Sequence, residues 1–406
     1  MFSLKKLDIT YIKNLLLTTV LGGVIGLLNY FFNIFVIRFT DKDVFSKYSA
    51  VLGIAYLMQM ISTAIQSVIT KAVAKNKNDN DTYYKWYAYK YLSVTGVVAA
   101  ILLFLFRGVV AQIASIPEGL VTYLAIGLGM SFVCSIAKGF LYAQERIMTA
   151  NLVALAETIF KFVIGFFAIR AGGNVPVLIV ANFLPQFIGT FALLPLISNT
   201  RKIGKLIRLD VKDIIYTSMF YLLLALPYTL DLILVNEKFR ADYSSVSLLG
   251  KIIYFACILS ASVMFARLSN ESDAQKRKKS LLISLGFAFM IGFVISVAYF
   301  ILGELIIKLT VGEEYLGIRQ YLGVFGLCMT GFACVYMVAN YFISQNVYSY
   351  LVVLALSSAM QVVIYKMRND SLQHVVQGQV FLYIILTVVT FIFLFISFKK
   401  HEKTKY

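Results

Sequence analysis

The sequence has few charged residues. Only 14% of its 406 residues carry a charge, whereas 60% are hydrophobic. A typical soluble domain is about 25% charged. A chain with so little polar surface cannot cover a globule that faces water on all sides, so the composition predicts an integral membrane protein.

Histidine and cysteine are also scarce, and this limits the chemistry that the chain can perform. The two histidines, His374 and His401, lie outside the long apolar runs, so a histidine-based metal centre or a Ser-His-Asp triad has almost no material. The cysteines fall inside apolar runs and are expected to pack there: Cys134, Cys257, Cys328 and Cys334. We therefore predict no catalytic residue, no metal site and no enzymatic activity.

Long apolar runs are abundant and predict an all-α protein of about twelve transmembrane helices, since one span needs about 20 apolar residues. The expected spans are 14–37, 48–69, 89–110, 120–142, 149–169, 176–197, 213–235, 243–266, 280–307, 318–342, 346–365 and 376–397. The connecting segments are short, which leaves little mass outside the bilayer.

The distribution of basic residues predicts the orientation. The formal net charge is +17. With a cytoplasmic N-terminus, Lys and Arg favour the inner segments over the outer ones by roughly two to one. We therefore expect both termini in the cytoplasm. The cluster Lys276-Arg277-Lys278-Lys279 is then an inner-face anchor rather than a nucleic-acid site.

The two halves of the chain resemble each other at an offset of roughly 200 residues. Gly127-Leu128 with Met130 matches Gly326-Leu327 with Met329, and Gln144 matches Gln345. Six spans per half keep both halves in the same orientation, so a parallel repeat is expected, as in many transporters. The predicted organisation is an N-terminal six-helix lobe (1–198), a basic cytoplasmic linker (199–212) and a C-terminal six-helix lobe (213–406).

Polar side chains inside the spans are expected to face the protein interior. In the first span Gly22, Gly26, Asn29 and Asn33 share one helical face, and the two glycines form a G-x-x-x-G motif that permits close helix approach. Other amides stand in the second and sixth spans. We expect these groups either to join helices by hydrogen bonds or to line a cavity: Asn29, Asn33, Gln59, Gln66, Asn182 and Gln186.

Charged residues inside the spans are the strongest functional candidates. Glu157 precedes Lys161 by four residues, which favours an ion pair on one helix, and that pair is either structural or functional. Lys138 lies in the preceding span. Lys251 lies roughly 12 Å along its helix from the start of the span, where it can extend outward or turn inward.

Asp231 lies four residues after Pro227 within the seventh span. Proline removes a backbone hydrogen bond and kinks a helix. A buried carboxylate beside such a hinge is a candidate ion or proton site, although it could instead pair permanently with a lysine.

Several of these residues belong to segments that resemble one transporter family. The segments are Asn29-Tyr30-Phe31-Phe32-Asn33, Lys138-Gly139 with Gln144, Glu157 with Lys161, Asp231 to Val235 with Tyr243 and Leu249-Gly250-Lys251, Arg267-Leu268-Ser269, and Gly312-Glu313-Glu314-Tyr315. Over nearly its whole length the chain resembles the polysaccharide flippases, similar to O-antigen flippases, of the multidrug/oligosaccharidyl-lipid/polysaccharide exporter superfamily.

The resemblance implies export of an undecaprenyl-pyrophosphate-linked oligosaccharide by alternating access in a bacterial or archaeal cytoplasmic membrane. It implies that Lys138, Lys161 and Lys251 attract the pyrophosphate, and that Asp231 or Glu157 couples transport to Na⁺ or H⁺, with no other cofactor. The implied partners are the lipid-linked oligosaccharide, membrane lipids and other polysaccharide-assembly proteins.

Two alternatives were weighed against the flippase. A multidrug extruder of the same superfamily would favour acidic and aromatic groups for lipophilic cations, whereas this chain has three lysines within its spans. A membrane-embedded glycan polymerase or glycosyltransferase is suggested only by Asp79-Asn80-Asp81, in a short polar loop without a nucleotide-binding domain.

Overall fold

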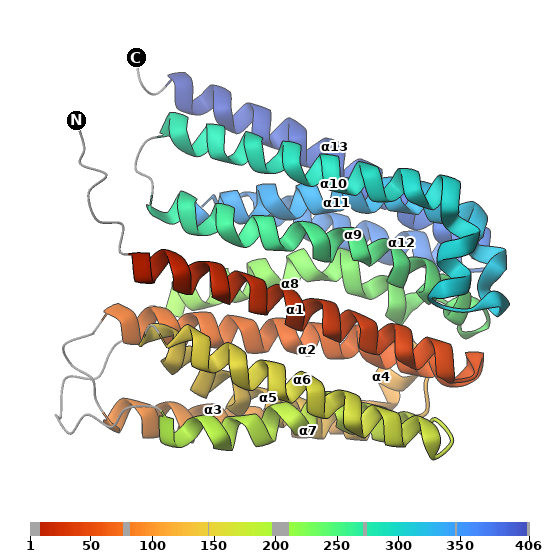
Figure 1. Ribbon diagram of the computed structural model, residues 1–406, viewed down its shortest axis with the longest axis horizontal. Coiled ribbons are helices and arrows are strands. Elements are labelled where there is room, and N and C mark those ends of the chain that lie inside the picture. The colour runs from red at the N-terminus through yellow and green to blue at the C-terminus, as the bar shows by residue number, and fades with distance from the viewer. Residues whose placement is uncertain are drawn as a thin grey trace. The chain divides into compact units, whose positions relative to one another are not determined.

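The computed structural model describes residues 9–75, 82–144, 146–196, 211–270, 274–345 and 347–403. Within these ranges all regular structure is helical (Figure 1). The elements are α1 (Ile9–Phe39), α2 (Lys42–Lys75), α3 (Thr82–Leu105), α4 (Arg107–Ala114), α5 (Glu118–Ala143), α6 (Ile147–Arg170), α7 (Val175–Leu193), η1 (Leu194–Leu196), α8 (Val211–Leu234), α9 (Glu237–Asn270), α10 (Ala274–Leu309), η2 (Glu313–Ile318), α11 (Arg319–Ser344), α12 (Tyr350–Met367) and α13 (Leu372–Lys403).

The predicted all-α membrane fold is confirmed. Ten helices in the described part of the chain are long and apolar enough to cross a membrane, and α8 adds the shorter apolar stretch Ser218–Leu234. The third predicted span, 89–110, differs in detail because its helix is interrupted at Phe106 and continues as the short α4. Most of the predicted linker and the Asp79-Asn80-Asp81 sequence lie outside the described residues.

Packing divides the chain into two compact units. The first unit consists of residues 1–32, 58–111 and 117–218, and the second consists of 33–57, 112–116 and 219–406. The helices α1 and α2 each contribute to both units, because α1 changes unit after Phe32 and α2 changes unit after Leu57. The lobe boundaries expected from the sequence repeat stay a prediction.

The fourth predicted spans of the two halves, α5 and α11, each pack among several helices of their own unit. In the first unit α5 packs against α3 and α7, and in the second unit α11 packs against α9, α10 and α13. The most apolar stretches of α5 and α11 are 61% and 78% buried, the two highest values among the ten candidate spans. Both helices end at the glutamines matched by the repeat, Gln144 and Gln345.

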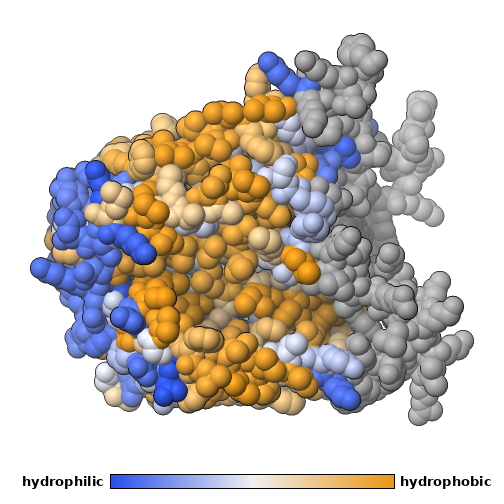
Figure 2. Space-filling model, turned by 180° about the vertical axis from the view of Figure 1, so that it is seen from behind, coloured by the Kyte–Doolittle hydropathy of each residue, from blue (hydrophilic) through white to orange (hydrophobic). Residues whose placement is uncertain are grey.

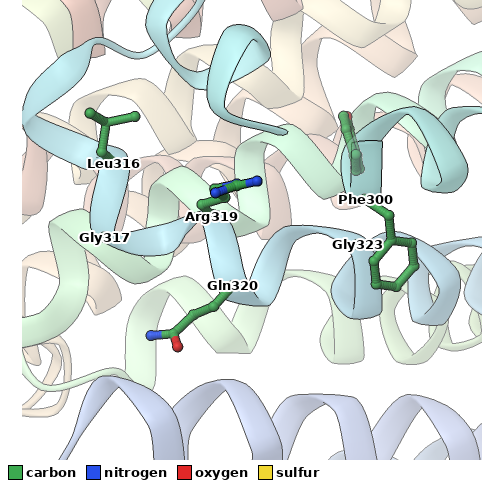
Figure 3. Close-up of a pocket in the computed structure, with 7 residues that line it drawn as sticks. Phe300, Leu316, Gly317, Arg319, Gln320 and Gly323 are labelled. Carbon is green, nitrogen blue, oxygen red and sulfur yellow. The ribbon is translucent and has the colours of Figure 1, made fainter. Parts of the chain in front are cut away.

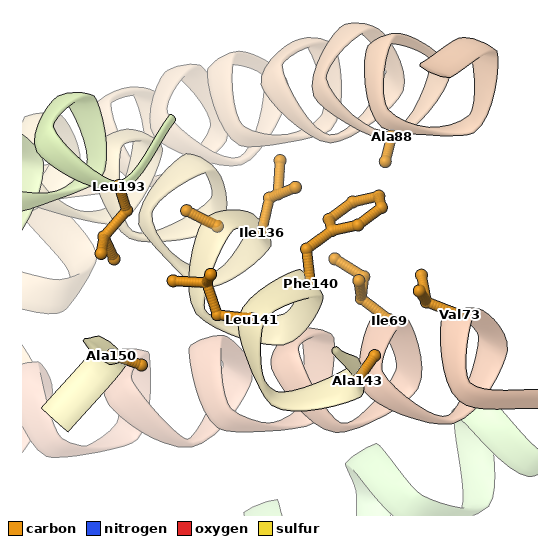
Figure 4. Packing of buried hydrophobic residues seen from close by; sticks show 10 residues of the cluster. Ile69, Val73, Ala88, Ile136, Phe140, Leu141, Ala143, Ala150 and Leu193 are labelled. Carbon is orange, nitrogen blue, oxygen red and sulfur yellow. The ribbon is translucent and has the colours of Figure 1, made fainter. Parts of the chain in front are cut away.

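The core of the first unit holds α5 against its neighbours. Its buried side chains interlock around Phe140 (Figure 4) and come from α2, α3, α5, α6 and α7: Ile69, Val73, Ala88, Ile136, Ala137, Phe140, Leu141, Ala143, Ala150 and Leu193. At Gly139 the helices α2 and α5 approach closely, because a Cβ there would stand 3.0 Å from Ile69 and 3.1 Å from the Gln66 carbonyl oxygen. This contact fixes the position of Lys138, the preceding residue.

The exposed surface is apolar where a membrane would lie. Large hydrophobic side chains such as Val94, Ile101, Phe289 and Phe293 are about half exposed. Figure 2 shows hydrophobic residues over the middle of the visible face, hydrophilic residues gathered at the left end and further hydrophilic residues toward the right. An exposed apolar surface of this extent is stable in lipid rather than in water, so the protein is a multi-pass membrane protein.

Candidate functional site

In the first unit, an ion pair between the half-buried Lys138 and the buried Glu157 joins α5 to α6. The Nζ atom of Lys138 donates a hydrogen bond to Oε2 of Glu157 at 2.7 Å. The other carboxylate oxygen, Oε1, is buried and has no hydrogen-bond partner among the described residues. It packs on Gly189 in α7 and leaves no room for a Cβ there. The expected pairing of Glu157 with Lys161 on one helix is therefore wrong, since the acid turns to the neighbouring helix.

Lys161 turns instead to α1. Its ammonium donates to Oδ1 of Asn29 at 3.1 Å and lies 4.4 Å from the centre of the Phe32 ring. Asn29 is held in place because its amide nitrogen donates to Thr158 Oγ1 at 3.3 Å and to the Ile25 carbonyl at 3.0 Å. Among the residues that the structure describes, no carboxylate lies within ion-pair distance of Lys161. In the described part of the first unit, Lys161 is thus a buried lysine without a neutralising acid.

In the second unit, Asp231 is completely buried and its carboxylate is surrounded by donors. Oδ2 accepts hydrogen bonds from Tyr243 at 3.1 Å and Ser247 at 2.9 Å, and Oδ1 accepts from the Leu232 amide at 2.9 Å. The Lys251 ammonium lies 3.4 Å from each carboxylate oxygen. Tyr243, Ser247 and Lys251 follow one another at intervals of four on α9, so one face of that helix supplies all three groups.

The carbonyl of Pro227, one turn before Asp231, is bound by side chains of α12 and α13. It accepts hydrogen bonds from Gln361 Nε2, Gln379 Nε2 and Tyr383 Oη at 3.0 to 3.3 Å. Tyr365 connects this group to the Asp231 cluster, since its hydroxyl donates to Gln379 Oε1 at 3.0 Å and lies 3.2 Å from the Tyr243 hydroxyl. The proline thus lies within a continuous buried hydrogen-bond network.

The remaining polar positions predicted from the sequence are dispersed. Asn33 is buried in the second unit, where it bonds to Tyr48 and Tyr56 on α2. Asn182 donates to Leu178 of its own helix. Gln59 is exposed, and Gln66 and Gln186 are half-buried. The G-x-x-x-G motif of Gly22 and Gly26 meets no helix within the described structure, because nothing lies within 4 Å of a Cβ built on either glycine.

Sequence reasoning missed several residues of the second unit. Gln361, Gln379, Tyr365 and Tyr383 are all buried within predicted spans, and a search for amides in the last two apolar runs would have indicated the two glutamines. Arg240 was also missed, although its side chain is fully buried and donates to the Val235 carbonyl through Nε and Nη2 at 3.1 and 2.7 Å.

A shallow pocket lies elsewhere in the second unit, where α10, η2 and α11 meet (Figure 3). None of the residues predicted for substrate or ion binding lines it. Its lining consists of Tyr299, Phe300, Leu316, Gly317, Arg319, Gln320 and Gly323.

Comparison with solved structures defines the class of fold. No protein-family model and no curated protein matches the sequence. The chain is similar in structure to the lipid II flippase MurJ in an inward closed conformation, with a TM-score of 0.75 and 12% identity, over 93% of this chain and 87% of MurJ.

Two further matches are transporters of the MOP superfamily. An inward-facing multidrug resistance transporter of the MATE family has a TM-score of 0.72 and 15% identity, over 94% of this chain and 96% of the other. A transporter from Pyrococcus furiosus, described by a binding pocket of reverse polarity, has a TM-score of 0.68 and 17% identity, over 94% of each chain. The chain therefore has the fold of these transporters.

Proposed function

We propose that the protein is a transporter that flips a lipid-linked oligosaccharide, carried on undecaprenyl pyrophosphate, from the inner to the outer leaflet by alternating access. The observation that carries the proposal is the buried Lys161 ammonium, which has an amide oxygen and a ring face as neighbours. An uncompensated cation inside a membrane protein is costly, so it favours a substrate that brings negative charge.

The pyrophosphate fits the polar groups of the first unit. Lysine has three donors, and Lys161 directs one of them to Asn29, which leaves donors for phosphate oxygens. Lys138 would join when a phosphate competes with Glu157 for its ammonium. Lys251 was also predicted to bind the pyrophosphate, but its ammonium lies on Asp231.

The proposal places the protein in a bacterial or archaeal cytoplasmic membrane with both termini in the cytoplasm. Membrane lipids and other proteins of polysaccharide assembly would be its partners. Pro227 would act as a hinge of α8. Ion coupling would involve Glu157 or Asp231, because these are the two buried acids of the described spans that lie beside a lysine.

The sidedness of lipid-linked oligosaccharide in cells depleted of this protein tests the proposal. Accumulation in the cytoplasmic leaflet that re-expression reverses is expected, and unchanged sidedness would contradict a flippase. Lys161→Met should fail to restore export while still reaching the membrane. Lys90→Met is the matched control, because Lys90 is an exposed lysine of the same unit.

Multidrug extrusion is the second candidate, and a row of tyrosines in the second unit favours it. The ring centres of Tyr56 and Tyr228 are 5.8 Å apart, those of Tyr228 and Tyr254 are 4.8 Å apart, and those of Tyr254 and Tyr336 are 5.2 Å apart. Aromatic rings attract lipophilic cations. New sensitivity of depleted cells to cationic dyes, with unchanged glycan lipids, would select this function.

A further inference from the structure

Asp231 is the buried carboxylate of the second unit, and its nearest cation is part of the chain itself. The Lys251 ammonium is equidistant from the two carboxylate oxygens, at 3.4 Å from each. On its other side it lies 4.5 Å from the centre of the Tyr228 ring. A positive charge at equal distance from the two carboxylate oxygens stands where a bound monovalent cation would stand.

We propose that Lys251 is the resident counter-cation of Asp231 and that it closes this carboxylate to Na⁺ and K⁺. Asp231 and Lys251 form a neutral pair, with side chains 0% and 4% exposed. An additional metal ion would leave a net positive charge in the interior of the helix bundle, where an unpaired charge is strongly unfavourable.

The oxygen atoms around the pair support this assignment. The carboxylate already accepts hydrogen bonds from the hydroxyls of Tyr243 and Ser247, so its negative charge is compensated without an added metal ion. The carbonyl of Pro227 accepts from three side chains. The described residues contain no cluster of three or more His, Cys, Asp or Glu that could hold a metal ion.

The role of Lys251 in coupling transport to an ion gradient rests on the proposed function. If the protein is an ion-coupled flippase, a sodium or potassium gradient does not act through Asp231, and Lys251 determines this selectivity. The binding part of the proposal is independent of transport, because it concerns only whether an alkali cation reaches the carboxylate.

The test measures cation binding by the full-length protein in detergent. Thermal unfolding is followed with a thiol-reactive dye, because the four free cysteines are buried in the folded state. Each variant is compared in NaCl, in KCl and in the chloride of a large organic cation at equal ionic strength, and ²²Na⁺ binding is measured in parallel.

The wild-type Tm should be the same in all three salts, and ²²Na⁺ should not bind at Asp231. In Lys251→Met the carboxylate loses its partner, so NaCl or KCl should raise the Tm by roughly 2–4 °C relative to the organic cation. That salt effect should vanish in Lys251→Met/Asp231→Asn.

Lys42→Met is the matched control, since Lys42 pairs with Asp242 at 2.8 Å in the same unit but both side chains are at least one third exposed. Its Tm should not depend on the alkali cation.

Wild-type ²²Na⁺ binding that Asp231→Asn abolishes would overturn the proposal, and this measurement does not require Lys251→Met to fold. A folded Lys251→Met variant whose Tm ignores the salt would also overturn it. Loss of glycan-lipid export is a separate observation, so failure of the flippase function and failure of this proposal are distinguishable.

Discussion

The Asp231–Lys251 pair should show strong energetic coupling in a double-mutant cycle. Two unit charges 3.4 Å apart attract each other by about 5 kcal/mol at an effective dielectric constant of 20. Removing one member of a buried pair leaves the other charge without its partner, and this typically costs about 3–5 kcal/mol. Asp231→Asn and Lys251→Met are therefore each expected to destabilise the protein severely.

The double variant Asp231→Asn/Lys251→Met should be more stable than either single variant, because it contains no unpaired buried charge. Replacing a buried pair by neutral groups is often close to neutral in stability, and the Asn amide still accepts from Tyr243 and Ser247. The expected order of Tm is wild type, then the double variant, then both single variants.

The assay follows thermal unfolding of the four proteins in detergent through the reactivity of their cysteines with the dye. All four proteins are measured in the chloride of the large organic cation. Single variants that unfold within about 1 °C of wild type would refute the reasoning, as would losses that simply add in the double variant. Either result would mean that the pair is hydrated or separated in the protein.

Three further changes have outcomes that follow from local geometry. Gly96→Ala should lower the free energy of unfolding by roughly 1–3 kcal/mol, because its Cβ would stand 2.9 Å from the Gly129 carbonyl oxygen. Gly26→Ala should leave the Tm equal or higher, since its site is open. Thermal unfolding measures both effects. Pro227→Ala should restore a helical hydrogen bond in α8 and slow glycan-lipid export without lowering the Tm, and an unchanged export rate would remove the hinge role. A hydrogen bond with His374 holds the pKa of Asp370 below its usual range. The stabilisation of the folded protein by this contact is therefore present above pH about 4 and lost as the pH falls below it. Because the carboxyl is exposed, the effect is small, and Asp370→Asn should leave the Tm at pH 7 unchanged.

The apolar runs predicted the helices well because hydropathy along the chain is a local property. Within the described residues, each expected span falls largely on helical structure, and the repeat identified Gln144 and Gln345 as the ends of equivalent helices. The break at Phe106 was not predicted, although the charged Arg107 follows it, because apolar residues resume at Val109 and the run was interpreted as one span.

The pairing of charges was harder to predict because it depends on which helices become neighbours. Four-residue spacing placed Glu157 and Lys161 on one face, but Lys138 on α5 takes the carboxylate. For Asp231, the sequence left an ion site and a permanent lysine pair open, and the structure shows the lysine pair. The stripe Tyr243, Ser247 and Lys251 was visible in the sequence, yet only packing of α8 against α9 directs it toward Asp231.

The buried charged residues of the two units favour a substrate of negative charge in the proposed transport cycle. Among the described residues of the second unit, Asp231 and Lys251 cancel, and the buried Arg240, which precedes the expected span 243–266, donates to backbone carbonyls rather than to an acid. In the first unit Lys138 and Glu157 cancel, which leaves Lys161 in excess. An anionic substrate would neutralise that excess when it binds and restore it on release, whereas a cationic drug would double it. Because the cost of an uncompensated charge falls when a pyrophosphate arrives, the charge arrangement favours the lipid-linked glycan over the lipophilic cation.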